Sequence, residues 1–388
     1  MLNFIYDIPT KVYFGKGQIK NLSKELKKID GNVLLVYGGG SIKKNGLYDE
    51  VIKEIELAGV KCFELAGVEP NPRIETVRLG VKLCKENDIK VVLAVGGGST
   101  IDASKFICAG ALTETDPWDF FVKGAPIDKA LPLISVLTLS ATGSEMDNCG
   151  VISNPNSTDK LGRADYNLFP TVSFLDPTYT YTVNKYQTAC GSADILSHVL
   201  ETYFSKEKDL FMLDGVMEAI MKTVIKYAPI AMAEPENYEA RANLMWASSW
   251  AINGFIIGGK IKTWSCHPLE HQLTANYGVT HGLGLAVITP KWMKYCLDDS
   301  SVDRFVSFGV NVFDIDKTLD KFEIAKKAIS KLEEFLYKTL NLADTFEKAG
   351  IGSDKIEFMA EKACKNGCID GFKPLYKKDI EQIFKMCI

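Results

Sequence analysis

The sequence predicts two domains of different class: an α/β domain with a parallel sheet over residues 1–182, followed by an all-helical domain over residues 183–388. Short apolar runs alternate with helical periods in the first half, which is typical of a parallel sheet covered on both faces. Two of those runs end in glycine-rich loops, and after Asp176-Pro177 only helical periodicity remains. A length of 388 residues is ample for two domains, each with its own core.

Six apolar runs have the length of buried strands, at residues 11–14, 32–37, 61–65, 90–95, 131–138 and 171–175. Helical periods lie between them at residues 48–57 and 74–86 and from residue 101 onward. The second half has helical periods at residues 194–203, 239–252, 325–340 and 355–365, without strand alternation. The boundary between the two domains is expected at residues 177–184.

The composition excludes several classes of protein. Hydrophobic residues make up 46% of the chain and charged residues 24%, which excludes a disordered chain. A net charge of −4 and a pI near 5.8 offer no broad basic surface to nucleic acid. We find no uncharged apolar run long enough to span a membrane, and residues 1–15 do not resemble a signal peptide. We therefore expect neither nucleic-acid nor membrane partners.

Ten scattered cysteines without a CxxC motif predict free thiols in a reducing compartment, the cytoplasm. Cys364 and Cys368 are spaced for one helix face. A metal or redox pair at these two residues is the alternative, but no second pair or nearby histidine completes it.

Two predicted strands end in the same sequence, Gly-Gly-Gly-Ser, at residues 38–41 and 96–99. Glycines at the carboxyl ends of parallel strands let backbone N–H groups approach a phosphate. A third turn, at residues 139–145, offers Thr142 to a pyrophosphate or ribose. Neither GxGxxG nor GKS/GKT occurs, so a typical Rossmann fingerprint and a Walker loop are excluded. The alternative is that these glycines only allow tight packing.

The first loop also bears on the choice of dinucleotide. No Asp or Glu stands at residues 38–42, where an acidic side chain would select a ribose 2′-hydroxyl, and Lys43 and Lys44 follow directly. This arrangement favours NADP over NAD. The alternative is that both lysines are solvated helix residues.

The chain has four histidines, His198, His267, His271 and His281. Asp194 and His198 are four residues apart, as are His267 and His271, so each pair shares one helix face. Pro268 places His267 at the start of a helix, and His281 is expected to begin another. Imidazoles with a carboxylate suit Zn²⁺ or Fe²⁺ better than Mg²⁺ or Ca²⁺. The sequence therefore predicts a metal site.

A rival motif occupies part of the same segment. His267-x-x-Glu270-His271 matches a metallopeptidase pattern in which Glu270 is the general base. That alternative leaves both glycine loops and the Asp194/His198 pair unexplained.

Together these motifs resemble the group III, iron-activated, alcohol dehydrogenases, most of all the NADP-preferring butanol dehydrogenases and broad aldehyde reductases among them. The resemblance covers essentially the whole chain. It is carried by residues 3–15, 37–44, 96–99, 141–145, 176–177, 239–243, 267–271 and 281–282.

The resemblance implies a fold similar to dehydroquinate synthase, with the active site in the cleft between the two domains, and a homodimer. It implies that the metal ligands are Asp194, His198, His267 and His281. His271 is then a neighbour of the metal that relays the proton. Spacing alone does not separate His271 from His267.

The resemblance also implies a set of cofactor contacts. They are Gly38, Gly39, Gly40, Ser41, Asn71, Gly97, Gly98, Ser99, Asp102, Thr138, Leu139, Thr142, Cys149 and Lys160. Members that prefer NAD carry an aspartate where this chain has Gly39. The residues alone suggest that Lys160 is a solvated loop lysine beside Asp159.

The activity implied is the interconversion of primary alcohols and aldehydes of the butanol type. A divalent metal would polarise the carbonyl while a hydride passes to or from the nicotinamide. Alternatives are a polyol dehydrogenase of the same superfamily, the metallopeptidase, or a non-catalytic nucleotide-binding protein. Trp118, Phe255 and Trp264 are candidate substrate contacts, or else core aromatics.

Overall fold

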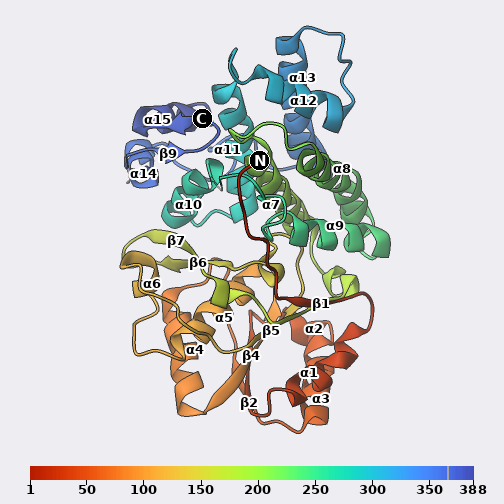
Figure 1. The fold of residues 1–388 in the computed structure, drawn as a ribbon, viewed down its shortest axis with the longest axis vertical. Helices are drawn as coiled ribbons and strands as arrows, with labels where there is room; N and C mark the ends of the chain where they lie inside the picture. Colours follow the sequence, from red (N-terminus) through yellow and green to blue (C-terminus); the bar gives the residue numbers. More distant parts are fainter. Residues whose placement is uncertain (262, 365–366) are drawn as a thin grey trace. The chain divides into compact units, whose positions relative to one another are not determined.

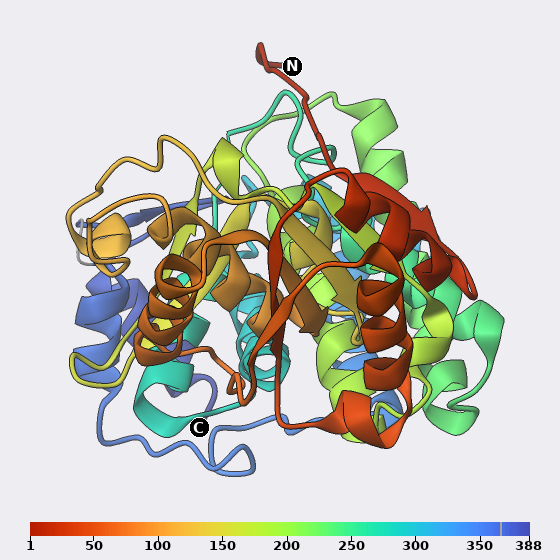
Figure 2. The ribbon, with the colours of Figure 1, turned by 90° about the horizontal axis from the view of Figure 1, so that it is seen from below.

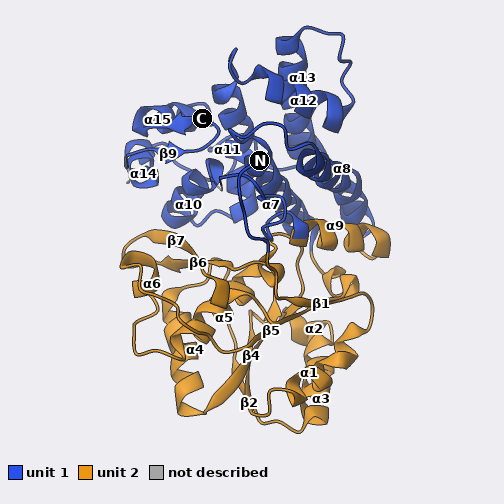
Figure 3. Ribbon diagram, viewed as in Figure 1, with its two compact units in different colours: residues 1–6, 184–234, 250–388 blue, residues 7–183, 235–249 orange. Residues whose placement is uncertain are grey.

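The structure, a computed structural model, describes residues 1–261, 263–364 and 367–388. Contacts divide the chain into two compact units (Figure 3). The α/β unit contains residues 7–183 and 235–249, and the helical unit contains residues 1–6, 184–234 and 250–388. These units differ from a single division at 182/183 in residue 183 and in two short segments, residues 1–6 and 235–249.

The α/β unit is built on a parallel sheet of six strands in the order β1-β8-β5-β4-β2-β3 (Figure 1). The strands are β1 (Lys11–Phe14), β2 (Asn32–Tyr37), β3 (Cys62–Leu65), β4 (Ile89–Gly96), β5 (Leu133–Leu137) and β8 (Val172–Leu175). The chain passes from β2 to β3 on one side and continues with β4, β5 and β8 on the other. The order therefore reverses between β2 and β4, and ligands of open α/β sheets bind outside the carboxyl ends of the strands at such a point.

Helices cover both faces of this sheet, as the continuous apolar strands predict. Alternate residues of β2 face opposite sides: Val33 and Leu35 pack with α1 (Leu22–Lys27) and α3 (Leu47–Ala58). Leu34 and Val36 pack on the other face. That face is covered by α4 (Ile74–Glu86) and α5 (Gly98–Gly110). Figure 2 shows α1 and α3 in red and α4 and α5 in orange on the two sides.

Further elements complete the α/β unit. An antiparallel hairpin of β6 (Cys149–Asn154) and β7 (Asp159–Ala164), which the sequence analysis did not predict, follows β5. Short helical turns are α2 (Ser41–Lys44), α6 (Asp119–Val122), Gln18–Asn21, Ser144–Met146, Tyr166–Leu168 and Pro177–Thr180. The helix α9 (Tyr238–Trp250) belongs to this unit up to Ser249.

The helical unit is confirmed as predominantly α-helical. Its helices are α7 (Lys185–Tyr203), α8 (Phe211–Ala233), α10 (Cys266–Tyr277), α11 (His281–Cys296), α12 (Val302–Phe313), α13 (Lys321–Glu333), α14 (Ile356–Ala363) and α15 (Lys377–Lys385). The predicted helix at 325–340 is α13 continued by a π-helical turn, Glu334–Thr339. The unit also contains two very short antiparallel strands, β9 (Ile369–Asp370) and β10 (Pro374–Leu375). None of the helices in the described parts of the chain is long and apolar enough to cross a membrane.

All ten cysteines are free thiols. Cys364 caps the end of α14, and Cys368 lies beyond that helix, so the prediction that they share one helix face is wrong. The helix ends at Ala363, so Cys368 lies four residues after the C-cap residue Cys364. Lys365, the last residue of the predicted helical stretch, lies outside the described residues.

Candidate metal centre and dinucleotide site

Helix α7 places Asp194 and His198 one turn apart on a shared face. Both side chains are buried, and Nε2 of His198 lies 3.5 Å from Oδ1 of Asp194. The predicted proximity of these two residues is confirmed by this distance. Because both side chains are buried, this carboxylate and imidazole are candidate metal ligands and not a solvated surface pair.

Helices α10 and α11 bring two more imidazoles to the same place. His267 stands in the first turn of α10, where its ring stacks on His198 at a centroid distance of 4.9 Å and an angle of 12°. His281 is the first residue of α11, as expected, and its Nε2 lies 3.6 Å from Oδ1 of Asp194. Residues far apart in sequence therefore meet within the helical unit.

The donor atoms fit a divalent ion. One ligand atom each from Asp194, His267 and His281 lie within 4.8 Å of one another. Oδ1 of Asp194 and Nε2 of His267 are both buried, and neither has a hydrogen-bond partner among the described residues. Such atoms are costly to bury, and an ion held between them would satisfy both. One carboxylate and imidazoles are the donors expected of a Zn²⁺ or Fe²⁺ site.

Two buried glutamates contact the Nδ1 atoms of the imidazoles. The sequence prediction did not include either of them in the metal site. Glu201 is buried on α7, and its carboxylate contacts Nδ1 of His267. Its other oxygen accepts from the backbone N–H groups of Ser265, at 2.5 Å, and Cys266, at 2.7 Å. With Nδ1 donating to this carboxylate, Nε2 would be the ring nitrogen left to accept a metal ion. Glu201 lies seven residues after Asp194, two turns along the same face, which was the available signal.

Glu270 holds the second imidazole in the same way. It is fully buried, and its two oxygens contact Nδ1 of His281 and the hydroxyl of Thr274. Both oxygens are thereby engaged, which argues against the metallopeptidase alternative, in which Glu270 is a general base. Glu270 instead holds Nδ1 of His281.

The electrostatics of the site also favour a cation. Asp194, Glu201 and Glu270 are three buried carboxylates around the imidazoles of the site. Burial by itself lowers the pKa of His267, but the charges of Glu201, then Asp194 and Glu270, outweigh it and raise that pKa. A divalent ion would balance this concentration of negative charge.

His271 lies beside the metal centre. It is half-buried one turn after His267, with ring centroids 6.4 Å from His267 and 5.9 Å from His281. It is not part of the close group of donor atoms from Asp194, His267 and His281, and neither is His198, the fourth expected ligand. The structure thus separates two histidines that sequence spacing made equivalent.

The three candidate aromatic residues have different surroundings. Trp264 contacts the site, with its ring 4.5 Å from that of His267 and 5.8 Å from that of His198. Trp118 lies in the core of the α/β unit. Phe255 packs edge-on against Tyr6 and Trp250. Of the three, Trp264 is the one whose ring contacts His198 and His267.

In the α/β unit, the glycine loops meet at the carboxyl edge of the sheet. The loops after β2, β4 and β5 leave three neighbouring strands. A Cβ atom at Gly98 would lie 2.2 Å from Oγ1 of Thr142, and one at Gly97 would lie 3.2 Å from Cβ of Leu139. The second loop is therefore packed directly on the turn that contains Leu139 and Thr142, and only glycine fits at position 98.

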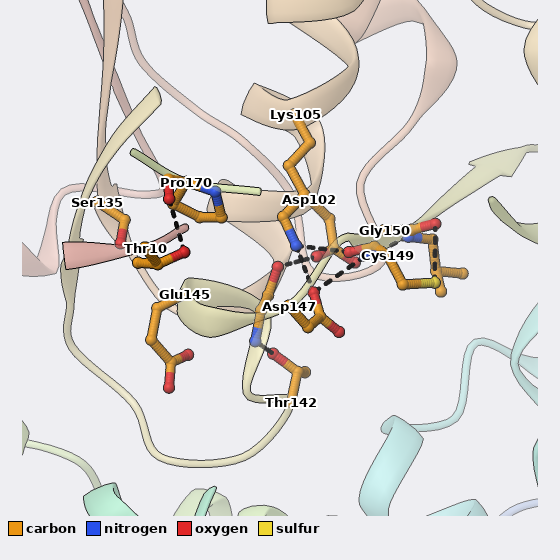
Figure 4. Close-up of polar contacts among 12 residues, drawn as sticks. Thr10, Asp102, Lys105, Ser135, Thr142, Glu145, Asp147, Cys149, Gly150 and Pro170 are labelled. Atoms are coloured by element: carbon orange, nitrogen blue, oxygen red, sulfur yellow. Dashed lines mark hydrogen bonds and ion pairs between the residues drawn. The ribbon is translucent and has the colours of Figure 1, made fainter. Parts of the chain in front are cut away.

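Two side chains of helix α5 bind the segment at residues 144–151, which follows the turn that contains Thr142 (Figure 4). Asp102 accepts hydrogen bonds from the hydroxyl of Ser144, at 2.6 Å, and the N–H of Val151, at 2.9 Å. One turn later, Nζ of Lys105 donates to Asp147, at 2.5 Å, and to the carbonyl of Cys149. Burial raises the pKa of Asp102 to about 6. Asp102 thereby positions residues 144–151 next to the second loop.

The remaining predicted cofactor contacts are dispersed around these loops. Lys160 stands on β7 and is buried, with 5% of its surface exposed, so its interpretation as a solvated loop lysine is wrong. Cys149 begins β6 and is half-buried. Asn71, with a φ of 55°, precedes α4. Thr138 follows β5, and its N–H donates to the carbonyl of Gly96 at 3.0 Å, while Ser99 is the second residue of α5.

Residues of the first loop are less enclosed. A Cβ atom added at Gly39 would meet nothing within 4 Å. Gly40 has a φ of 95°, which suits glycine, and Ser41 begins α2. Lys43 and Lys44 are both exposed on that short helix. The loop therefore has space for a ribose substituent, and two cations follow it.

Comparison with known proteins defines the class of protein. A family profile described as "Iron-containing alcohol dehydrogenase" matches residues 9–177, and one described as "Fe-containing alcohol dehydrogenase family, C-terminal" matches residues 188–388. Together they cover nearly the whole chain. The chain belongs to the iron-containing alcohol dehydrogenase family.

Individual relatives match over their full lengths. The chain is 51% identical to NADH-dependent butanol dehydrogenase A of Clostridium acetobutylicum over 99% of both chains. It is 37% identical to NADPH-dependent aldehyde reductase YqhD of Escherichia coli over 95% of this chain and 94% of that one. The crystal structure of NADH-dependent butanol dehydrogenase A from Thermotoga maritima matches with a TM-score of 0.95 and 36% identity, covering 100% of this chain and 99% of that one.

Proposed function

We propose that the chain is a metal-dependent, NAD(P)-linked oxidoreductase that interconverts primary alcohols and aldehydes of the butanol and butanal type. The observation that carries this proposal is the group of donor atoms from Asp194, His267 and His281, with carboxylates behind the two imidazoles. Such a group suits a family whose members are described as iron-containing alcohol dehydrogenases.

The residues that would hold a Fe²⁺ or Zn²⁺ ion are Asp194, His198, His267 and His281. A divalent ion bound there supplies Lewis acidity toward a carbonyl oxygen. The protein residues have separate tasks. Glu201 and Glu270 keep Nε2 of the two imidazoles directed at the site. His271, whose ordinary pKa is near neutrality, exchanges the proton of the alcohol oxygen with solvent.

We assign dinucleotide binding to the three loops at the carboxyl edge of the sheet, with Asn71, Asp102, Cys149 and Lys160 around them. We propose a preference for NADP(H), supported by the absence of a carboxylate at Gly39 and by Lys43 and Lys44. The relatives differ in the cofactor that they are named for, which is NADH for the butanol dehydrogenase and NADPH for the aldehyde reductase. The preference of this chain between NADP(H) and NAD(H) is therefore to be measured directly.

We further infer a cytoplasmic homodimer. Ten free cysteines support a reducing compartment. Dimerisation follows from the resemblance to the family. Size-exclusion chromatography with light scattering tests the oligomeric state.

The proposal is tested by following oxidation of NADPH and of NADH with butanal. Metal-stripped protein is compared before and after addition of Fe²⁺ or Zn²⁺. Turnover that returns with the metal, and is faster with NADPH, is the expected result. Absence of turnover with either dinucleotide in folded, metal-loaded protein would refute the aldehyde reductase proposal.

A further inference from the structure

Four side chains form a cluster beside the first glycine loop: Tyr37, Lys43, Tyr48 and Glu64, the Glu64 cluster. The two oxygens of Glu64 each accept one phenolic hydroxyl, from Tyr37 at 2.7 Å and from Tyr48 at 2.6 Å. The two rings meet edge to face, with centroids 5.8 Å apart. Glu64 therefore fixes both rings.

The rings in turn hold a cation. Nζ of Lys43 lies 4.4 Å from the centroid of the Tyr48 ring and 5.1 Å from that of Tyr37. These distances are in the range of cation–π attraction. The hydroxyl of Tyr37 as a hydrogen-bond partner raises the pKa of Lys43, which keeps its charge at neutral pH. An exposed lysine is thus held in one place instead of moving freely in solvent.

The Glu64 cluster lies next to the first glycine loop, where a dinucleotide would bind. Tyr37 is the last residue of β2, Glu64 lies on the neighbouring strand β3, and the N–H of Lys43 donates to the carbonyl of Gly40 at 3.1 Å. The cluster is therefore adjacent to the loop at the point where the strand order reverses. In sheets of this type the ribose of a dinucleotide binds beside the first loop, where an acidic side chain reads the 2′-hydroxyl and a cation accommodates a 2′-phosphate. The cluster contains one group of each kind.

We propose that Glu64 is a specificity-determining residue for the dinucleotide: through the two tyrosines it holds Lys43 beside the ribose 2′ position, and its own charge limits how strongly a 2′-phosphate is favoured. Lys43 attracts the phosphate, and Glu64 repels it and partly neutralises Lys43. We therefore expect the protein to bind NADP(H) more tightly than NAD(H) while still accepting both. The inference rests on the proposed dinucleotide function.

Titration calorimetry with NADP⁺ and NAD⁺ tests the inference without requiring turnover. Lys43→Met is expected to weaken NADP⁺ binding about tenfold, as for loss of one hydrogen bond to a charged group, and to leave NAD⁺ binding nearly unchanged. Glu64→Gln keeps the size and an acceptor oxygen while removing the charge. It is expected to raise the affinity for NADP⁺ relative to NAD⁺ about threefold, the size of an exposed charge interaction.

Lys53→Met is the control, because Lys53 is an exposed lysine of α3 that belongs neither to the glycine loops nor to the Glu64 cluster. It is expected to leave the ratio of the two dissociation constants within about twofold of the original protein, as for a solvated surface charge. An unchanged ratio in Lys43→Met or in Glu64→Gln would overturn the inference, as would an equal effect of Lys53→Met and Lys43→Met. Failure of the unmodified protein to bind either dinucleotide would refute the proposed function instead.

Discussion

The carboxylate of Glu270 contacts Nδ1 of His281, and Nε2 of the same ring lies 3.6 Å from Oδ1 of Asp194. A buried acid thus fixes which nitrogen of the imidazole is available to a metal. Glu201 and His267 repeat the arrangement on the neighbouring helix. The site is defined as much by these two acids as by the ligands themselves.

Replacing Glu270 by Gln should weaken metal binding at least about tenfold, the lower end of the effect of such supporting groups. The amide keeps the volume and one acceptor but loses the charge that balances the ion. Competition with a coloured chelator measures the affinity. Glu323→Gln, an exposed residue of α13, is the control. Unchanged affinity in Glu270→Gln would show that Glu270 only fills space.

His271→Ala should retain the metal and lose rate. His271 lies outside the close group of donor atoms, while loss of a general acid–base typically lowers kcat by about 10²-fold or more. Metal content and kcat are measured on the same preparation. His267→Ala is the comparison and should lose both together. Full activity in His271→Ala would remove this residue from the mechanism.

Gly39→Asp should shift preference toward NAD(H), because a carboxylate there repels a 2′-phosphate and accepts from a 2′-hydroxyl. The structure leaves room for the new side chain, since a Cβ at this position meets nothing within 4 Å. The ratio of kcat/KM for the two cofactors should change about tenfold or more, as for a hydrogen bond to a charged group. Gly39→Asn, equal in size but uncharged, should produce a smaller shift. An unchanged ratio in the aspartate variant would contradict the proposed role of this loop.

Glu145 should make stability depend on pH. It is fully buried, and Oε1 accepts from the hydroxyl of Ser249 at 2.5 Å. Within the part of the chain that the structure describes, Oε2 has no hydrogen-bond partner. Burial raises its pKa from 4.5 to about 7. Below pH 4.5 the Glu145 carboxyl is protonated in both the folded and the unfolded chain. Between pH 4.5 and about 7 only the folded chain keeps this proton, so the free energy of unfolding falls as the pH rises toward 7.

Glu145→Gln has no such proton to lose. Relative to the original protein, its free energy of unfolding should rise by up to about 3 kcal/mol between pH ~5 and pH ~8. Urea unfolding of the metal-free protein at the two pH values measures the difference. Parallel pH profiles for the two proteins would show that Glu145 is ionised in the fold.

The parallel strands were predictable because each is a continuous apolar run. The hairpin of β6 and β7 was not, since β6 has only the short apolar pair Val151-Ile152 between glycine and polar residues. Its partner β7 reads Asp-Lys-Leu-Gly-Arg-Ala, in which charged residues and glycine interrupt the apolar ones. The alternative that Lys160 is a solvated loop lysine failed for the same reason, because only the hairpin shows that its side chain is covered.

The metal site was predictable in part. Spacing of four residues indicates a shared helix face, and it brought Asp194 and His198 together correctly. The same spacing rule could not decide whether His267 or His271 is the metal ligand. Both lie on one face of the same helix, and spacing does not show which of its turns faces Asp194. The contact of Glu201 with His267 makes that choice in the fold.

Neither unit is a single stretch of chain. The chain passes between them after residues 6, 183, 234 and 249. A fragment of residues 1–183 would lack Ser249, the partner of Glu145, and Met245, which belongs to the core of the sheet. The two halves are therefore not interchangeable modules: a chimera of two family members joined only at residue 183 would combine one parent's sheet with the other parent's α9, and it would inherit a mismatched core at that helix.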